Sequence, residues 1–402
     1  MPAKPVNEMP LGDIRVLDLS RILAGPYCTM ILGDLGAEVI KVERPETGDD
    51  TRAWGPPFAG GESAYYLCCN RNKKSITIDL KNPRGSGLVK ELAKVSDVLI
   101  ENFTPGLMKG FGLDYETLRE HNPRLIYCSI SAYGQDGPYR DRPGYDMVLS
   151  AVGGLMWITG PEGGEPCKVG VAITDVLTGV YASGAIMAAM IQRGRSGRGQ
   201  HIDCSLLDVQ VAGLANIASN YLVAGKEAQR WGTAHESIIP YQVFRTKDKP
   251  IAIAVANQKL WESFCRTIEK QEWIKDPRFE SNAKRVENRV ELVARVAEVL
   301  AQKSCDEWIE LFVDASIPCG PVNNMQCLFD DPQVLHREMV VNVPHETIGT
   351  LRLTGVPIKY SETPGTVRLP PPLLGQHTDE ILTGVLGYSK DQVESLRQHG
   401  AV

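Results

Sequence analysis

The sequence lacks the patterns that mark metal-binding and disulfide-rich proteins. Its 10 cysteines form no CxxC pair and follow no regular spacing, so neither a zinc site nor a disulfide framework is indicated. We therefore expect free, mostly buried thiols in an intracellular protein. The 7 histidines are scattered without metal-ligand spacing, and we expect no metal site.

Signals for membranes, nucleic acid and export are also missing. No apolar run reaches the roughly 18 residues of a membrane-spanning helix. A formal net charge of -6 gives no general attraction to nucleic acid or to an anionic membrane. The first residues, MPAKPVNEMPLGD, show neither the apolar core of a secretory signal nor the Arg-rich character of a transit peptide, so we expect any targeting segment to be absent or already removed.

What is present is a long alternation of strand-like and helix-like segments in 402 residues, enough for two domains. The alternation favours an α/β fold with a parallel, doubly wound sheet. The first strand, turn and helix resemble a dinucleotide-binding unit, but the turn lacks GxGxxG, so no nicotinamide or flavin is expected. Strands are predicted at residues 14–19, 37–43, 75–80, 98–101 and 124–131, and a helix at 83–95.

The pattern changes after about residue 205, which suggests a discontinuous large domain. A helical stretch over 206–223 leads into a charged region, and residues 231–330 then read as a smaller α+β unit. Beyond residue 331 the chain becomes strand- and proline-rich. We predict a large Rossmann-like domain from 1–205, a linker at 206–230, a small domain at 231–330, and a segment at 331–402 that returns to the large domain.

The segment GVAITDVLTGVYASGAIMAAMIQ places one acidic residue, Asp175, where a helix is predicted to begin. Apolar residues follow at helical spacing, with small residues thinning one face. An aspartate at a helix start often only caps backbone N–H groups. A helix N-terminus also favours the ionised carboxylate, which can act as a nucleophile. Position alone leaves both roles open.

Several segments together resemble family III CoA-transferases, the group that includes formyl-CoA transferase and carnitine CoA-transferase. They span nearly the whole chain in the family's order and are VLDLSRILAGPYCTMILGDLGAEVIKVERP, NRNKKSITIDL, ENFTPG, ISAYGQDGPYRDRPGYDMVLSAVGG, ITDVLTG, RSGRGQHIDCSLLD, GVPIKYSETPG and LPPPLLGQHTDEIL. Within the family, the chain is most similar to mitochondrial members that exchange CoA between succinyl-CoA and glutarate. The resemblance implies an interlocked homodimer, located in the mitochondrial matrix, in which each chain threads through its partner.

The resemblance also places the family's catalytic aspartate on Asp175. Its carboxylate would attack an acyl-CoA thioester, accept the acyl group as a mixed anhydride, and then hold CoA as an aspartyl thioester. A free acid would take up the CoA by the same steps in reverse. Thioester and anhydride are similarly activated, so CoA thioesters serve as substrates and no permanently bound cofactor is needed. Backbone N–H groups are the expected oxyanion donors.

By the same resemblance, the CoA site should contain cations for phosphate and an aromatic surface for adenine or pantetheine. The matching positions are Ile22, Ala24, Arg44, Lys73, Lys74, Asn102, Phe103 and Lys109. Lys109 only approximates an arginine that relatives carry after ENFxPG, and a solvated basic surface is the alternative for the lysines. The glycine-rich loop of formyl-CoA transferase has no counterpart in GTAHESIIPY, which implies a different gate or none.

At the acid-binding end, the resemblance and the local charges indicate a second group of residues. Arg21, Tyr145 and Asp146 match positions that line the family's active site, while Arg140, Arg142 and His235 could reach a free carboxylate. Ordinary surface ion pairs are the alternative. The expected partners are acyl-CoA, small carboxylic acids and a second copy of the chain.

Two rival functions share this fold or site. An α-methylacyl-CoA racemase needs a second base, which is a histidine in its Gly-His-Asp segment. Here that segment is Gly144-Tyr145-Asp146, and a tyrosine, with an ordinary pKa of about 10, is a poor substitute. The other rival is a CoA-binding protein without turnover, which the intact ITDVLTG segment argues against.

Overall fold

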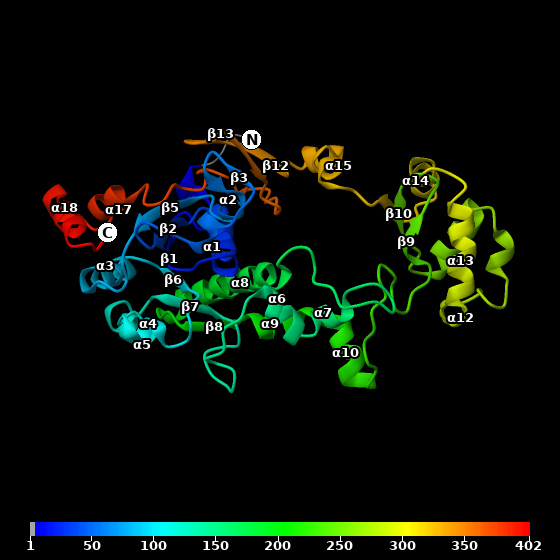
Figure 1. Cartoon of the computed structure of the whole chain (residues 1–402), viewed down its shortest axis with the longest axis horizontal. Coiled ribbons are helices and arrows are strands. Elements are labelled where there is room, and N and C mark those ends of the chain that lie inside the picture. Colours follow the sequence, from blue (N-terminus) through cyan, green and yellow to red (C-terminus); the bar gives the residue numbers. More distant parts are fainter. Residues whose placement is uncertain (1–4) are drawn as a thin grey trace. The chain divides into compact units, whose positions relative to one another are not determined.

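The structure is a computed structural model that describes residues 5–402 (Figure 1). These residues form two compact units, each with its own buried apolar core. Unit 1 comprises residues up to 155, 168–226 and 332–402. Unit 2 comprises residues 156–167 and 227–331. The large unit is therefore assembled from segments far apart in the sequence.

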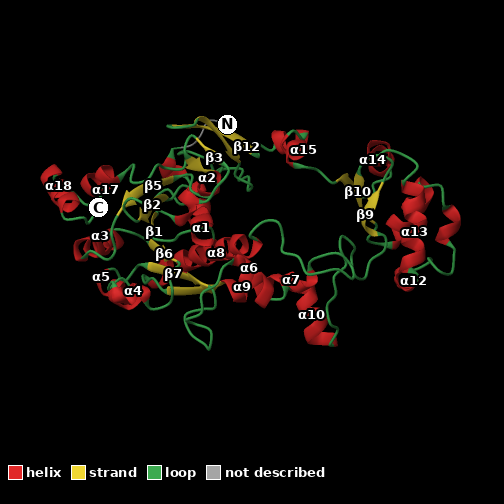
Figure 2. Ribbon diagram, in the orientation of Figure 1, coloured by secondary structure: helices red, strands yellow, loops and turns green. Residues whose placement is uncertain are grey.

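Unit 1 is built on a six-stranded parallel sheet with the order β5-β2-β1-β6-β7-β8 (Figure 2). The strands are β1 (Arg15–Asp18), β2 (Glu38–Glu43), β5 (Lys73–Thr77), β6 (Val98–Glu101), β7 (Ile126–Ser131) and β8 (His201–Ser205). This confirms the α/β fold with a Rossmann-like sheet. The strand order reverses between β1 and β6, and ligands of such sheets bind beyond the carboxyl ends of the strands at that point.

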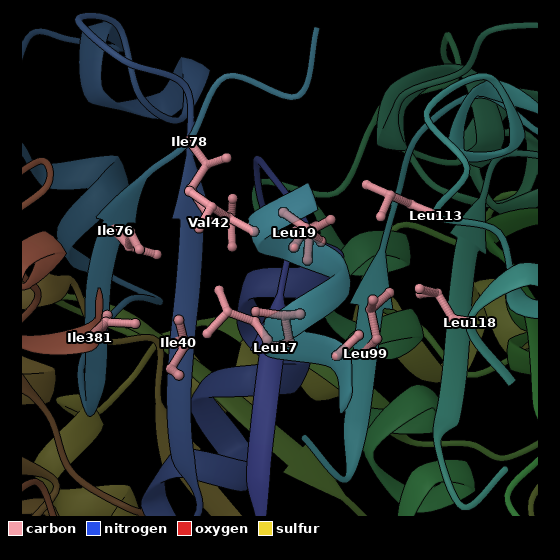
Figure 3. Close-up of a cluster of buried hydrophobic side chains, with 14 of the residues drawn as sticks. Leu17, Leu19, Ile40, Val42, Ile76, Ile78, Leu99, Leu113, Leu118 and Ile381 are labelled. Carbon is pink, nitrogen blue, oxygen red and sulfur yellow. The ribbon is translucent and has the colours of Figure 1, made fainter. Parts of the chain in front are cut away.

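Helices cover both faces of this sheet because alternate strand residues point to opposite sides. Leu17, Ile40 and Leu99 lie on neighbouring strands and share one apolar cluster (Figure 3) with α3, α5, α17 and α18. Val16 and Val39 join a second cluster on the opposite face, with α1 and α8. The two layers hold the carboxyl ends of the strands in a fixed arrangement.

The helices of unit 1 vary from single turns to a 24-residue helix. They are α1 (Ala24–Asp34), α2 (Ala64–Leu67), α3 (Pro83–Lys94), α4 (Leu107–Gly110), α5 (Tyr115–His121), α6 (Asp146–Val152), α8 (Ile173–Ser196), α9 (Leu206–Gly213), α10 (Ala215–Ala224), α16 (Pro332–His336), α17 (Thr378–Gly384) and α18 (Lys390–Gln398). Short elements complete the unit: η1 (Val6–Glu8), η2 (Asp50–Ala53), and the hairpins β3 (Phe58–Ala59) with β4 (Glu62–Ser63) and β12 (Val340–His345) with β13 (Gly349–Thr354).

Helix α8 packs closely on α1. A Cβ atom at Gly179 would lie 2.7 Å from the Ala24 carbonyl oxygen, so only glycine allows this approach. Contrary to the expectation from the sequence, α8 is long and apolar enough to cross a membrane by length and composition. In the structure 44% of its apolar window is buried, with Ala182 and Ile186 in the core of unit 1. The helix thus uses much of its apolar surface to support the sheet.

Unit 2 combines a three-stranded antiparallel sheet with a layer of helices. Its elements are α7 (Leu155–Ile158), which begins at the boundary, β9 (Tyr241–Arg245), β10 (Pro250–Ala254), α11 (Gln258–Thr267), η3 (Gln271–Ile274), α12 (Asn282–Glu287), α13 (Arg289–Leu300), α14 (Cys305–Asp314), β11 (Cys319–Pro321) and α15 (Met325–Phe329). Phe264 stacks between Trp261 and Phe312 in its core, at ring-centroid distances of 6.2 and 5.7 Å.

Three segments differ from what the sequence suggested. Strand β8 completes the sheet but was not predicted from the sequence. It is an edge strand, in which the exposed residues His201 and Asp203 alternate with the half-buried Ile202 and Cys204. Residues 206–226, where a linker was expected, form α9 and α10 within unit 1. Residues 156–167 belong to unit 2.

Candidate active site

A pocket lies beyond the carboxyl ends of β1, β6 and β7, at the place where the strand order reverses. It is formed by the turns that follow these three strands and by the first turn of α8. Its lining residues are Arg21, Ile22, Leu23, Ala24, Asn102, Phe103, Thr104, Pro105, Leu107, Ile130, Ser131, Ala132, Arg140, Arg142, Pro143, Gly144, Tyr145, Asp175 and Leu206. Nine of the residues singled out from the sequence are among them, although the sequence separates them by up to 154 positions.

Asp175 lies in the first turn of α8 and is not the residue that caps this helix. The N-cap position is Ala172, whose side chain makes no capping bond. Instead, Asp146 at the start of α6 accepts hydrogen bonds from the backbone N–H groups of Thr174 (2.8 Å) and Asp175 (3.3 Å). Among the described residues, no group donates a hydrogen bond to the Asp175 carboxylate itself. That carboxylate therefore faces the pocket without a competing partner.

The surroundings of Asp175 destabilise its charged form. Burial, followed by repulsion from Asp146, raises the pKa of Asp175 to about 7. No arginine of the pocket contributes to this shift. A carboxylate with a raised pKa is a stronger base and a better nucleophile than an ordinary one, while remaining largely ionised at slightly alkaline pH.

Arg21, Asn102 and Phe103 form a rigid bridge in the pocket wall. The side-chain amide of Asn102 donates to the Arg21 carbonyl oxygen (2.7 Å) and accepts from its N–H (2.9 Å). The Arg21 guanidinium lies 5.2 Å from the Phe103 ring centroid. Both Arg21 and Phe103 also line a second pocket, together with Arg44, Leu80 and Phe111. The two pockets therefore share a wall.

The three arginines of the first pocket differ in how they are paired. Arg21 binds Asp50 at 2.7 Å, and Asp50 also binds Arg44 at 2.6 Å. Arg140 binds Asp141 at 3.3 Å and donates to the Gln135 carbonyl oxygen. The Arg142 guanidinium stacks 3.7 Å from the Tyr139 ring centroid. Within residues 5–402 no carboxylate forms an ion pair with Arg142, which leaves its charge available to an anion.

The prediction that Lys73 binds phosphate is wrong. Its side chain is fully buried, and its ammonium group donates to Asp18 (3.2 Å), to the Pro26 carbonyl oxygen and to Asn70 (both 2.9 Å). A buried ammonium needs these partners, because an unpaired buried charge costs several kcal/mol. Lys73 thus connects the end of β1 to the start of α1 inside unit 1.

Four other predicted residues are not among the lining residues of the two pockets. Lys74 pairs with Glu38 (3.1 Å) and Glu380 (2.8 Å), and Lys109 is exposed on α4; neither lines a pocket. His235 belongs to unit 2, where its ring contacts Tyr241 and its Nδ1 accepts from the Ser237 N–H. Asp146 is buried and acts on α8 rather than lining the pocket. In the described part of the chain, no group of three or more His, Cys, Asp or Glu side chains could hold a metal ion.

One residue that the sequence did not suggest is coupled to the site. Tyr65 on α2 has its pKa raised to about 12 by burial and by the charge of Asp175. Tyr65 also packs edge-to-face on Trp54, with ring centroids 5.1 Å apart, and both line a further pocket with Cys68. In the sequence, only the aromatic residues of the segments TRAWGPP and SAYYLCC indicate the contact between Trp54 and Tyr65.

We predict that Asp146 tunes the pH dependence of the site. Asp146→Asn keeps an oxygen that can accept from the α8 N–H groups but removes the charge next to Asp175. The lower-pH limb of kcat/KM, which should fall near pH 7 in the natural protein, is expected to move down by roughly one pH unit.

Two further variants serve as controls for this pH profile. Asp146→Ala also removes the cap and should lose about 1 kcal/mol of stability. Asp136→Asn neutralises an exposed carboxylate in the loop that precedes α6 and should leave the profile unchanged. An Asp146→Asn profile identical to that of the natural protein would contradict the electrostatic role.

Comparison with known proteins gives consistent matches over the full chain. The model of CoA-transferase family III matches residues 11–378. The chain is 50% identical over 396 residues to succinyl-CoA:glutarate CoA-transferase of Homo sapiens, covering 98% of this chain and 90% of the human protein. It is 44% identical to succinate–glutarate CoA-transferase of Agrobacterium fabrum, covering 94% and 96%. The crystal structure of a CAIB/BAIF family protein from Brucella suis superposes with a TM-score of 0.85 at 42% identity, covering 94% and 100%.

Proposed function

Because the chain belongs to CoA-transferase family III, we propose that it transfers CoA from succinyl-CoA to glutarate or a related dicarboxylate through covalent intermediates on Asp175. The observation that carries this proposal is the buried Asp175 carboxylate, with a raised pKa, in a pocket lined by three arginines. The names of the human and Agrobacterium relatives support the choice of substrates.

The proposed reaction balances with Asp175 alone as the covalent group. A carboxylate oxygen of Asp175 attacks the thioester carbonyl, the C–S bond breaks, and CoA leaves as a thiolate from a mixed anhydride. The thiolate then attacks the aspartyl carbonyl, which releases the first acid and forms an aspartyl thioester. The second acid attacks this thioester, which expels the CoA thiolate and forms a second mixed anhydride. The thiolate attacks the new acyl group of this anhydride, which gives the product acyl-CoA and releases the Asp175 carboxylate. Asp175 is regenerated without any net transfer of protons or electrons.

The two pockets with a common wall support a placement of CoA across them. We propose that Arg44 in the second pocket meets the phosphates, while Phe103 offers a stacking face. Ile22, Ala24 and Asn102 would then border the pantetheine arm on its way to Asp175. Asp50, which holds both Arg21 and Arg44 by ion pairs, is the group that a phosphate would displace.

A panel of free acids offered against succinyl-CoA tests the proposal. New acyl-CoA products are scored by mass spectrometry, and glutaryl-CoA is the expected main product. A panel that yields no acyl-CoA with any acid would favour the CoA-binding protein without turnover.

The α-methylacyl-CoA racemase is the second candidate, since it shares the position of the catalytic aspartate. Tyr145 occupies the place of its second base, and this side chain is 61% exposed at the pocket. An exposed tyrosine is a poor general base at neutral pH, because its ordinary pKa is about 10. Exchange of solvent deuterium into a 2-methylacyl-CoA would demonstrate the racemase, and we expect none.

We further propose that the chain forms an interlocked homodimer, as its resemblance to the family implies. Large apolar side chains of unit 1 support this, because Tyr221, Leu222 and Val223 on α10 are 56%, 80% and 83% exposed in the single chain. Such a patch usually marks a protein contact. The resemblance to mitochondrial members also suggests the mitochondrial matrix as the location, which fractionation of the source cells would test.

The dimer is expected to persist at nanomolar concentration. Interlocked chains separate only through large-scale unfolding, so dissociation is limited by the rate of unfolding. Two differently tagged preparations should therefore exchange no subunits over hours when mixed at about 10 nM, as followed by mass photometry and co-purification. Rapid exchange, or a monomer at this concentration, would contradict interlocking.

A further inference from the structure

Two loops provide most of the wall of the first pocket. Each loop donates a backbone hydrogen bond to an acidic side chain of the sheet. The first loop follows β6 and contains residues 102–106; the second follows β7 and contains residues 132–145. Glu101 accepts a hydrogen bond from the Phe103 N–H at 2.8 Å. Asp203 accepts one from the Gln135 N–H at 2.9 Å. Each loop is thus tied at its base to one carboxylate of the sheet.

The two carboxylates belong to one row across the sheet. Glu101 on β6 is in register with Ser129 on β7, and Ser129 is in register with Asp203 on β8. Because residues in register on parallel strands point to the same face, the three side chains lie on the same side. The Ser129 hydroxyl also contacts His201 Nε2 at 2.9 Å. We call Glu101, Ser129 and Asp203 the acidic row.

The acidic row is electrostatically strained. Glu101 is only 4% exposed, and burial raises its pKa to about 7; hydrogen bonds from Ser129 and the Phe103 N–H oppose this shift, and repulsion from Asp203 adds to it. No cation contributes to the shift. The titratable groups around the row are Asp203 and His201 on β8, Tyr127 and Cys128 on β7, and Asp114, Tyr115 and Glu116 at the start of α5.

We propose that the acidic row is a pH-dependent positioning element, in which Glu101 fixes the pocket loop after β6 for CoA binding when it is ionised and loosens this loop when it is protonated. The reason is that a carboxylate accepts a hydrogen bond from a backbone N–H more strongly than a carboxylic acid does. Phe103 moves with this bond, and Phe103 packs against Arg21 in the wall common to both pockets. Glu101 acts on binding and takes no part in the covalent steps. The inference rests on the proposed binding of CoA at this site.

The test measures CoA binding by calorimetry in an Asp175→Asn background, which removes turnover and the titration of Asp175. Between about pH 8 and pH 6, the affinity for free CoA is expected to fall about fivefold. Adding Glu101→Gln, which keeps an acceptor oxygen without charge, should hold the affinity at its low-pH level throughout. Adding Glu120→Gln, an exposed carboxylate on α5, should leave the fivefold change in place. The phosphates of CoA titrate alike in every variant, so differences between variants isolate the row.

Two more variants separate Glu101 from its neighbours. Asp203→Asn keeps an acceptor for the Gln135 N–H but removes the repulsion, so the midpoint of the affinity change should move to lower pH. This shift remains measurable if the Glu101→Gln protein does not fold. His201→Gln should leave the pH dependence of CoA affinity in place. Loss of this pH dependence in His201→Gln would make the histidine the sensor and overturn the proposal. An unchanged pH dependence in both Glu101→Gln and Asp203→Asn would also overturn it. If CoA binds to none of the variants, the proposed function itself fails.

Discussion

Replacing Asp175 by alanine or asparagine should lower turnover by several orders of magnitude while the protein still folds and binds CoA. Alanine removes the nucleophile, and asparagine leaves a nearly isosteric group that is far less nucleophilic. Among the described residues that line the pocket, Asp175 is the one carboxylate. Asp146 is buried at the α8 N-terminus and accepts from two backbone N–H groups. No neighbouring side chain can therefore take over the covalent step.

The covalent intermediate on Asp175 should also be trapped in the natural protein. Incubation with succinyl-CoA alone, without an acceptor, should leave a thioester or anhydride that hydroxylamine converts to a stable adduct on the peptide containing Asp175. Mass spectrometry of the digested protein detects this adduct, and the Asp175→Asn protein is the matched control. Full activity in either variant, or an unmodified peptide after trapping, would refute the assignment.

Stability provides an independent readout of the same variants. The pKa of Asp175 in the folded protein is about 7, well above its usual 3.8, so the folded state binds the proton more tightly than the unfolded state. The group therefore stabilises the fold below about pH 4, and this contribution is lost as pH rises through 7. Asp175→Asn should raise the melting temperature relative to the natural protein at about pH 8, with a gain on the order of a few kcal/mol in unfolding free energy, and much less at about pH 4.

Much of the fold could be predicted because its signals are local. Buried β-branched residues mark β1, β2, β6 and β7, and the prolines and glycines between them mark the turns. Strand β8 could not be found this way, because its outward residues His201 and Asp203 are polar and its role depends on pairing with β7. The membership of residues 156–167 in unit 2 likewise depends on contacts with residues distant in the sequence.

For the site, too, local motifs identified the residues, whereas their contacts with distant parts of the sequence could not be predicted. The motifs singled out Asp175, Arg21, Asn102 and Phe103, and these residues line one pocket in the structure. They could not distinguish a cation that faces a ligand from one that balances a buried acid, and Lys73 proved to be the second kind. Nor could they show that Asp146 binds the N-terminus of α8 rather than a substrate. Both distinctions depend on which charge lies within about 3 Å in space.

The second large effect that we expect is on the KM for the acid substrate when a pocket arginine is neutralised. A five-carbon dicarboxylate carries a second charge some distance from the reacting carboxylate. Burying that charge without a partner would cost several kcal/mol, so the pocket should offer a cation. Arg21, Arg140 and Arg142 all line the pocket. The first two are already paired with Asp50 and Asp141, whereas the Arg142 side chain stacks on Tyr139 and forms no ion pair within residues 5–402.

Neutralising at least one of these three arginines should raise the KM for glutarate or succinate tenfold or more, which corresponds to about 1.4 kcal/mol. We expect the largest increase for Arg142→Gln, because its guanidinium can bind a carboxylate in bidentate geometry without first breaking an ion pair. Arg142→Lys keeps the charge but not this geometry and should fall between Arg142→Gln and the natural protein. Affinity for free CoA should change little in each variant.

Two comparisons decide the outcome of this experiment. Arg119→Gln removes an exposed arginine from α5 and should leave every KM unchanged. A monocarboxylate of similar length has no distal charge to lose, so its KM should be high in the natural protein and insensitive to Arg142→Gln. If all three single variants retain the natural KM for dicarboxylates, or if the natural protein uses the monocarboxylate equally well, the dicarboxylate assignment is wrong. The family membership would then stand with a different acid in the pocket, because it rests on the sequence match and not on these arginines.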